Sequence, residues 1–251
     1  MRKLIAVLLV VCFCKCSCPN SESSVTENVD SLQWISMLAE DSEIFSLKQI
    51  PEGFVLDTFQ QFDNTKKMGI FIVMPVSDME GINSVVKAGI EAQKNQFIAE
   101  LGEVIEGFVS ELYLVPLSIY KDEKIISFSF VMSYYHAGAA HPVSFYHSFN
   151  FDAKTNKLID FDDYFLIKSK TDFFTNVIAP FIRQDREDID LWIDNDDMED
   201  FKTIKDLDFN IEQDTISFNF DNYEIACYAE GLIQGRIHKK ALFDKIRPNY
   251  R

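Results

Sequence analysis

The chain has 251 residues, and its 24 basic against 40 acidic side chains give a formal net charge of −16. Hydrophobic residues make up 47% and charged residues 25%, which is typical of a folded globular chain rather than a disordered one. The acidity argues against nucleic-acid binding, because phosphate contacts need a basic face.

Residues 1–18 have the pattern of an export signal. Arg2 and Lys3 precede an apolar stretch, 4–13, which is too short to span a hydrocarbon core of ~30 Å but suits a secretory signal. The cysteines that follow resemble the acylation point of a bacterial lipoprotein signal. We therefore predict acylation of Cys18 and a membrane-anchored lipoprotein that faces the periplasm or the exterior. Ordinary signal cleavage is the alternative, because Lys15 stands where such signals usually have an aliphatic residue.

Residues 19–45 are predicted to form a polar linker, followed by two α+β halves at 46–158 and 159–251. Strands are expected at 54–59 and 68–75, and Ser77 with Glu80 has capping-box spacing. A long amphipathic helix that ends near Gly107 should follow, because one apolar stripe recurs at helical spacing. The stripe comprises Val86, Ile90, Phe97, Leu101, Val104 and Phe108.

Strands are then predicted at 112–120, 126–135 and 143–151; in the second, the large apolar residues Phe128, Phe130, Met132 and Tyr134 share one face, and Ser127, Ser129 and Ser133 lie on the other. If the last two form a hairpin around 137–142, His136 lies opposite Val143 and Met132 opposite His147.

In the second half, Asp160 is predicted to cap a short helix, and a helix over 170–183 must kink or end at Pro180. A hairpin is predicted at 209–220. Together these elements predict an α+β fold with mixed or antiparallel sheets, one long helix and one or two shorter ones.

Residues that could carry chemistry have simpler structural interpretations. His136, His141 and His147 match no zinc spacing, and His147 shares a face with aromatic residues, which favours a core histidine. The nine acidic residues of 185–200 lack the calcium-loop pattern, so a solvated loop is expected. A lone thiol such as Cys227 is more often buried than catalytic. We predict no cofactor and no metal.

Two motifs carry a family resemblance. The segments His136-Ala-Gly-Ala-Ala-His-Pro142 and Asn222-Tyr-Glu-Ile-Ala-Cys-Tyr-Ala-Glu-Gly231 resemble a bacterial extracytoplasmic domain of unknown function. That domain occurs in RsiV-type anti-sigma factors and beside PdaC-type peptidoglycan deacetylases. Asn222 and Cys227 stand where the family usually has proline, and Asn156 replaces a turn glycine in a position that suits a left-handed conformation.

The resemblance implies protein recognition rather than catalysis, since RsiV-like members bind lysozyme. We therefore expect a non-enzymatic, envelope-anchored binding module, whose partner is a lysozyme-like cationic protein or peptidoglycan. The expected binding residues are Gly138, Ala139, Ala140, His141, Pro142, Tyr223, Glu224, Tyr228, Glu230 and Gly231. The alternative is a peptidoglycan- or glycan-modifying hydrolase that uses His141 with Asp162 or Asp163.

Overall fold

The computed structural model describes residues 47, 49–194 and 204–251, all within one compact unit that spans Asp41–Arg251. The predicted export signal, Cys18 and the linker lie outside the described residues, as do the last acidic residues of 185–200. No helix of the described residues is long and apolar enough to cross a membrane.

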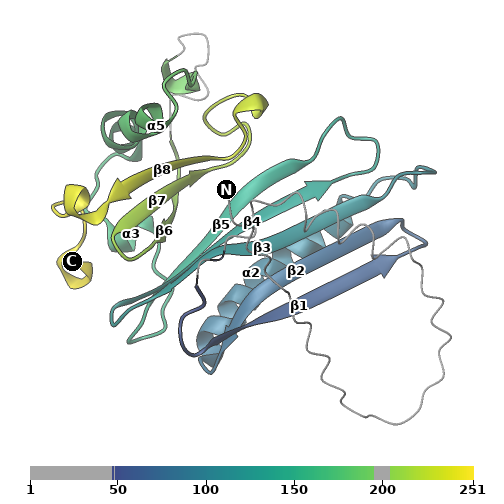
Figure 1. The fold of residues 1–251 in the computed structure, drawn as a ribbon, viewed down its shortest axis with the longest axis horizontal. Coiled ribbons are helices and arrows are strands. Elements are labelled where there is room, and N and C mark those ends of the chain that lie inside the picture. The colour runs from purple at the N-terminus through teal and green to yellow at the C-terminus, as the bar shows by residue number, and fades with distance from the viewer. Residues whose placement is uncertain (1–46, 48, 195–203) are drawn as a thin grey trace, which may run out of the picture. The chain divides into compact units, whose positions relative to one another are not determined.

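The first half of the fold is a five-stranded sheet with one long helix on it (Figure 1). Its elements are β1 (Phe54–Asp63), β2 (Met68–Ser77), α2 (Glu80–Ala99), β3 (Ser110–Lys121), β4 (Ile125–Tyr135) and β5 (Val143–Asp152). The strands lie in chain order, and only β2 and β3 are parallel, because α2 carries the chain back across the sheet between them.

The second half is a three-stranded antiparallel sheet with short helices. Its strands are β6 (Asp208–Ile211), β7 (Thr215–Phe220) and β8 (Ile233–His238). Helical segments are α3 (Phe161–Tyr164), α4 (Lys170–Phe173), the π-helix η1 (Phe174–Ile178), α5 (Ala179–Asp185), and the 3₁₀ turns η2 (Trp192–Asp194), η4 (Tyr228–Glu230), η5 (Lys239–Leu242) and η6 (Pro248–Tyr250). The α+β prediction is thereby confirmed.

Helix α2 is shorter than predicted. Val86, Ile90 and Phe97 are buried as expected, but the helix ends at Ala99, so the later part of the apolar stripe lies beyond it. Phe108 is 49% exposed, because the chain turns back there to begin β3. The capping box is also wrong: Asn83, not Glu80, holds Ser77, with its Oδ1 accepting the Ser77 N–H at 3.1 Å.

The helix predicted over 170–183 exists, but it is interrupted in a way that accommodates Pro180. The N–H of Ala179 donates to the carbonyl of Phe174 and closes the π-helical segment. Pro180 then sits in the first turn of α5, where the N–H that it lacks is least needed.

The predicted hairpin register between β4 and β5 is wrong by two residues. Tyr134, not His136, lies opposite Val143, and Phe130 lies opposite His147. The connecting loop is longer than the predicted turn, because Ala139 donates to the carbonyl of His136 around Gly138, whose φ is +89°. A shift of two leaves every side chain on its predicted face.

Asn156 adopts the left-handed conformation expected for it, with φ +57°.

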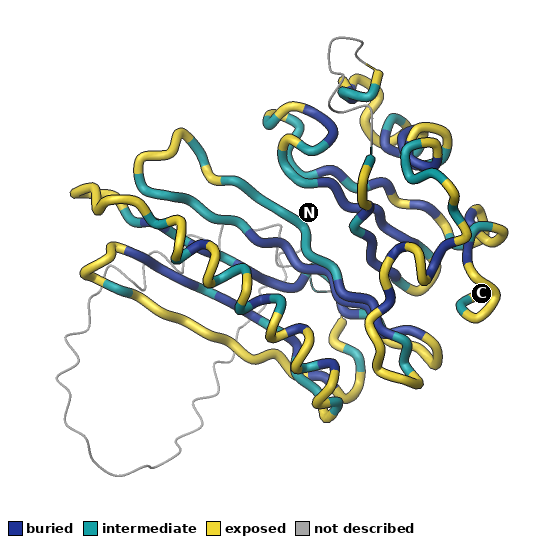
Figure 2. The backbone as a smooth tube through the Cα atoms, turned by 180° about the vertical axis from the view of Figure 1, so that it is seen from behind, coloured by how far each residue is buried: buried dark blue, intermediate teal, exposed yellow. Residues whose placement is uncertain are grey.

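Two apolar cores lie on either side of a polar layer. One core fills the space between α2 and the five-stranded sheet, and the other lies between the three-stranded sheet and α3–α5. The serine face of β4, which faces away from α2, is buried rather than solvated: Ser127 and Ser129 are 0% and 1% exposed. Figure 2 shows most of β4 in dark blue, since the residues of both faces are buried along Ile125–Met132. Contacts of β6 with β4 and β5 cover this face.

Candidate binding site

The loop after β4 and the segment between β7 and β8 meet in a cluster of three aromatic rings. The ring of His141 stacks on that of Tyr228 with centroids 3.8 Å apart, and Tyr223 lies 5.6 Å from Tyr228. The Tyr223 hydroxyl lies 3.4 Å from Nε2 of His141. We call His141, Tyr223 and Tyr228 the aromatic cluster.

Backbone contacts fix the two segments against each other. The hydroxyl of Tyr228 donates to the carbonyl of Pro142 at 2.9 Å. The N–H of Asn222 donates to the carbonyl of Ser144, and its side-chain oxygen accepts the Ser144 N–H at 2.8 Å. A proline at 222 could make neither of the two bonds to Ser144, because it lacks both the N–H and the side-chain oxygen, so asparagine at this position supplies a pairing contact between the segments.

The predicted binding residues divide into three groups. His141, Tyr223 and Tyr228 form the aromatic cluster, in which Tyr223 is 46% exposed and the other two are half-buried. The loop residues Gly138, Ala139, Ala140 and Pro142 are exposed. The remaining residues serve the fold: Oε2 of Glu224 accepts the N–H of Asp221, and Glu230 lies 3.8 Å from Arg186. Gly231 has φ +67°, which favours glycine there.

Cys227, beside the cluster, is exposed, so the expectation that it is buried is wrong. It directly precedes the 3₁₀ turn η4, which runs along the surface.

Sequence reasoning missed a second feature, a row of polar side chains along the outer edge of β5. Three side chains accept alternate N–H groups of that strand, as a further strand would. The bonds join Ser144 to Asn222, Tyr146 to Asp221 at 2.7 Å, and Ser148 to Asp208 at 3.0 Å. These residues close the edge of the sheet.

Asp208, Asp221 and Glu224 form an acidic cluster beside a cavity of about 680 Å³ between the two sheets. Burial raises the pKa of Asp221 to about 6 and that of Glu224 to about 7, against backbone hydrogen bonds that favour the charged forms. Burial also raises the pKa of Asp208, although Ser148 and Asn219 donate to it. The sequence signal that could have revealed this cluster is the alternation of Asp, Asn and Ser along β6 and β7. It places the polar side chains on one face of the second sheet, and that face packs on the first sheet.

His147 and His136 are packed against rings. His147 makes an edge contact with Phe149, with centroids 4.6 Å apart, and burial lowers its pKa. Gly89 lets α2 approach this pair, because a Cβ there would lie 2.6 Å from Phe149. His136 stacks on Phe97 at 5.2 Å. The described residues contain no group of three side chains placed to hold a metal ion.

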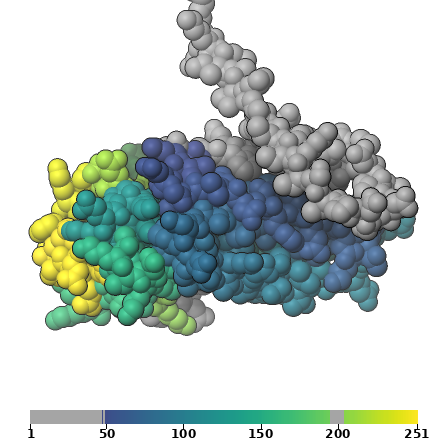
Figure 3. Space-filling model, turned by 90° about the horizontal axis from the view of Figure 1, so that it is seen from below, coloured from purple at the N-terminus to yellow at the C-terminus, as the bar shows by residue number. Residues whose placement is uncertain are grey.

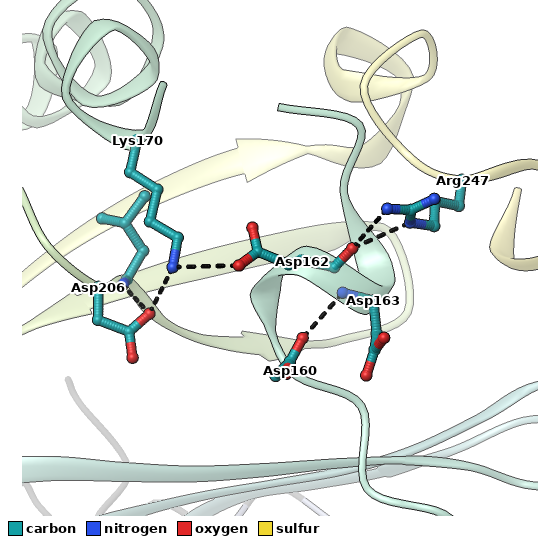
Figure 4. Close-up of polar contacts among 7 residues, drawn as sticks. Asp160, Asp162, Asp163, Lys170, Asp206 and Arg247 are labelled. Atoms are coloured by element: carbon teal, nitrogen blue, oxygen red, sulfur yellow. Dashed lines mark hydrogen bonds and ion pairs between the residues drawn. The ribbon is translucent and has the colours of Figure 1, made fainter. Parts of the chain in front are cut away.

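The carboxylates near α3 have structural partners (Figure 4). Asp160 accepts the N–H of Asp163 at 2.9 Å, which confirms the predicted helix cap. Lys170 lies 3.6 Å from the carboxylate of Asp162, whose carbonyl accepts two bonds from Arg247. Among the described residues no hydrogen bond or ion pair joins these carboxylates to His141, and neither Asp162 nor Asp163 lines the cavity.

The geometry therefore defines a two-sheet domain with a partly exposed aromatic cluster and a buried acidic cluster. The family model described as "Protein of unknown function (DUF3298)" matches residues 145–240, from β5 to the end of β8, so a DUF3298 domain is detected. No curated protein matches the chain.

Two solved structures share the fold. A DUF3298 family protein from Pseudomonas aeruginosa PAO1 aligns with a TM-score of 0.55 and 13% identity, covering 80% of this chain and 97% of that one. A DUF3298 family member from Bacteroides fragilis aligns with a TM-score of 0.52 and 15% identity, covering 78% of this chain and 94% of that one. At such identities the likeness establishes the fold alone.

Proposed function

We propose that the chain is a non-enzymatic binding module of the cell envelope and that the aromatic cluster is its recognition surface. The observation that carries the proposal is the meeting of two segments that reach the surface, 138–142 and 223–231, through the stack of His141 on Tyr228. Both segments contain the motifs that resemble the RsiV-type domain. Rings held by neighbouring backbone lose little entropy when a partner covers them, which suits them to binding.

The partner that the charge favours is a lysozyme-like cationic protein. The chain carries −16, and removal of 1–17 would leave 21 basic against 40 acidic side chains, or −19. A strongly acidic surface accelerates encounter with a basic partner. Peptidoglycan is the second candidate, because stacked rings at a surface also suit a sugar face.

The hydrolase alternative has less support. A histidine and a carboxylate must lie within hydrogen-bonding reach of each other or of a common substrate to share proton transfer. His141 instead contacts Pro142 and two tyrosines, while Asp162 is held by Lys170.

We expect the full chain to be retained by immobilised lysozyme at low salt, and Tyr228→Ala to weaken this binding by about tenfold or more, as loss of an aromatic anchor does. The measurement is surface plasmon resonance, repeated at high salt and on purified peptidoglycan. Phe243→Ala is the control, because Phe243 is 58% exposed and lies outside the cluster. Retention on neither surface contradicts the proposal, and retention on peptidoglycan alone selects the second candidate.

The proposed envelope location rests on the signal at 1–18. Intact-mass spectrometry of protein extracted from membranes should show a diacylglycerol-sized increment on a chain that begins at Cys18. Recovery of an unmodified mature N-terminus would contradict the lipid anchor and favour ordinary signal cleavage.

A further inference from the structure

Strand β1 forms an unusually exposed edge of the five-stranded sheet. Among the described strands it pairs only with β2, through ten consecutive residue pairs without a bulge. Eight of its ten residues are exposed. Four of these are large and apolar: Val55 (65%), Leu56 (38%), Phe59 (38%) and Phe62 (46%). Figure 2 shows the strand as an almost continuous yellow tube.

The two edges of this sheet are treated differently. At β5, side chains of Asp208, Asp221 and Asn222 occupy the outward N–H groups. Residues 54–63 of β1 contain no Pro, Lys or Arg and its pairing with β2 has no bulge, so Asp57 is the one exposed charge that protects this edge. A long, regular edge with apolar side chains is a template for another strand. In Figure 3 the purple-blue atoms of the first described residues lie at the surface.

We propose that β1 pairs in antiparallel fashion with β1 of a second copy of this chain, so that the two five-stranded sheets become continuous. A twofold axis perpendicular to the sheet produces this pairing, and it keeps equivalent faces together. Side chains that oppose each other across the axis must then lie on the same face of the sheet. Since successive side chains alternate faces, the axis must pass beside a residue and not between two residues.

The register centred on Phe59 is self-complementary. It places Phe59 opposite its own copy on the α2 face, where Lys94 lies 4.9 Å over the ring. It also places Leu56 of each copy opposite Phe62 of the other. The twofold axis produces this pair twice, so all four of these exposed apolar side chains are covered. Asp57 falls opposite Gln61, and no like charges oppose each other within the strand.

The charges at the two ends of β1 favour the same register. Glu52 precedes the strand and Lys66 lies in the turn that follows it, and both are exposed. Centring on Phe59 brings each Glu52 opposite the Lys66 of the other copy, giving two ion pairs. A parallel arrangement would instead bring the two Lys66 side chains together. This charge complementarity selects a second copy, in antiparallel orientation, as the occupant.

The test is sedimentation equilibrium of the purified full chain over a wide concentration range. We expect a monomer–dimer equilibrium that Phe59→Asp weakens by at least about tenfold, because like charges then meet at the axis. Lys94 can pair with the new carboxylate, which preserves the fold. Phe243→Asp is the matched control, since Phe243 is also exposed and has a cation, Arg251, 5.0 Å over its ring.

A charge exchange tests the register. Glu52→Lys and Lys66→Glu should each weaken the dimer by about threefold, and the double exchange should restore it. A chain that remains monomeric at every concentration overturns the proposal. This is also the result expected if another segment covers β1. A dimer that tolerates Phe59→Asp, loses affinity equally with Phe243→Asp, or is not restored by the double exchange also overturns it.

Discussion

The free energy of unfolding should fall as pH rises from 5 to 8, because the acidic cluster is buried. Asp221 and Glu224 have pKa values of about 6 and about 7 in the folded protein, above the ordinary values of 3.8 and 4.5. The folded state therefore binds more protons than the unfolded state between about pH 4 and pH 7. Their stabilising contribution is complete below pH 3.8 and is lost as the pH passes through the folded pKa values.

Each shift corresponds to at most about 3 kcal/mol, and the two carboxyls interact, so we expect a net loss of about 3 kcal/mol between pH 5 and 8. His147 acts in the opposite direction, because its lowered pKa favours the folded state as the pH rises towards 6.5. One histidine offsets only part of the effect of two carboxyls. Urea denaturation at each pH, followed by circular dichroism, gives the free energies.

Amide variants isolate the cause. Asp221→Asn keeps an oxygen that can accept the Tyr146 N–H, and Glu224→Gln keeps one for the N–H of Asp221. Each should raise the free energy of unfolding at pH 8 by about 1–2 kcal/mol and flatten the pH dependence. Glu123→Gln, in the exposed turn before β4, is the control. An unchanged pH dependence in the double variant would show that these carboxyls do not cause it.

The sequence predicted the elements better than it predicted the chemistry between them. Alternation along β4 assigned its two faces correctly, because strand geometry imposes a period of two. It could not reveal that the serine face packs against a second sheet, since Ser127 and Ser129 look solvated when read locally. The cluster of Asp208, Asp221 and Glu224 was missed for the same reason, because charged side chains are usually exposed to solvent.

The lengths of loops and helices were also beyond local reasoning. The stripe through Leu101 and Phe108 continues at helical spacing, but the parallel pairing of β3 with β2 requires the chain to leave the helix at Ala99. Likewise, the residue pattern did not reveal that the hairpin loop is lengthened by the left-handed Gly138 and the bond from Ala139 to the carbonyl of His136. The approach of His141 to Tyr228 depends on both sheets, so sequence could single out each segment but not their stacking.

Replacing Asn150 should produce one of the largest losses of stability, because this residue joins the two sheets through the buried polar layer. Asn150 is 3% exposed. Its amide donates to the carbonyl of Phe209 at 2.8 Å, and its oxygen accepts the hydroxyl of Ser127 at 2.7 Å. Ser127 in turn accepts the N–H of Ile211 at 2.9 Å. One side chain thus connects β4 and β5 to β6.

Asn150→Ala leaves the hydroxyl of Ser127 and the carbonyl of Phe209 without these partners and opens a small cavity. Each buried unsatisfied group costs about 1–3 kcal/mol, so we expect a loss of about 3–4 kcal/mol in the free energy of unfolding. Asn176→Ala is the matched control, because the Asn176 amide also donates to a backbone carbonyl at 2.8 Å but is exposed. Its cost should stay below about 1 kcal/mol.

A double-mutant cycle tests whether the polar layer acts as a unit. Ser127→Ala removes the hydroxyl that donates to the Asn150 oxygen. The loss of unfolding free energy caused by Ser127→Ala should therefore be smaller when residue 150 is already alanine. The expected coupling is about 1–2 kcal/mol, within the range for contacting buried partners. Additive losses would mean that the two residues stabilise the sheets independently.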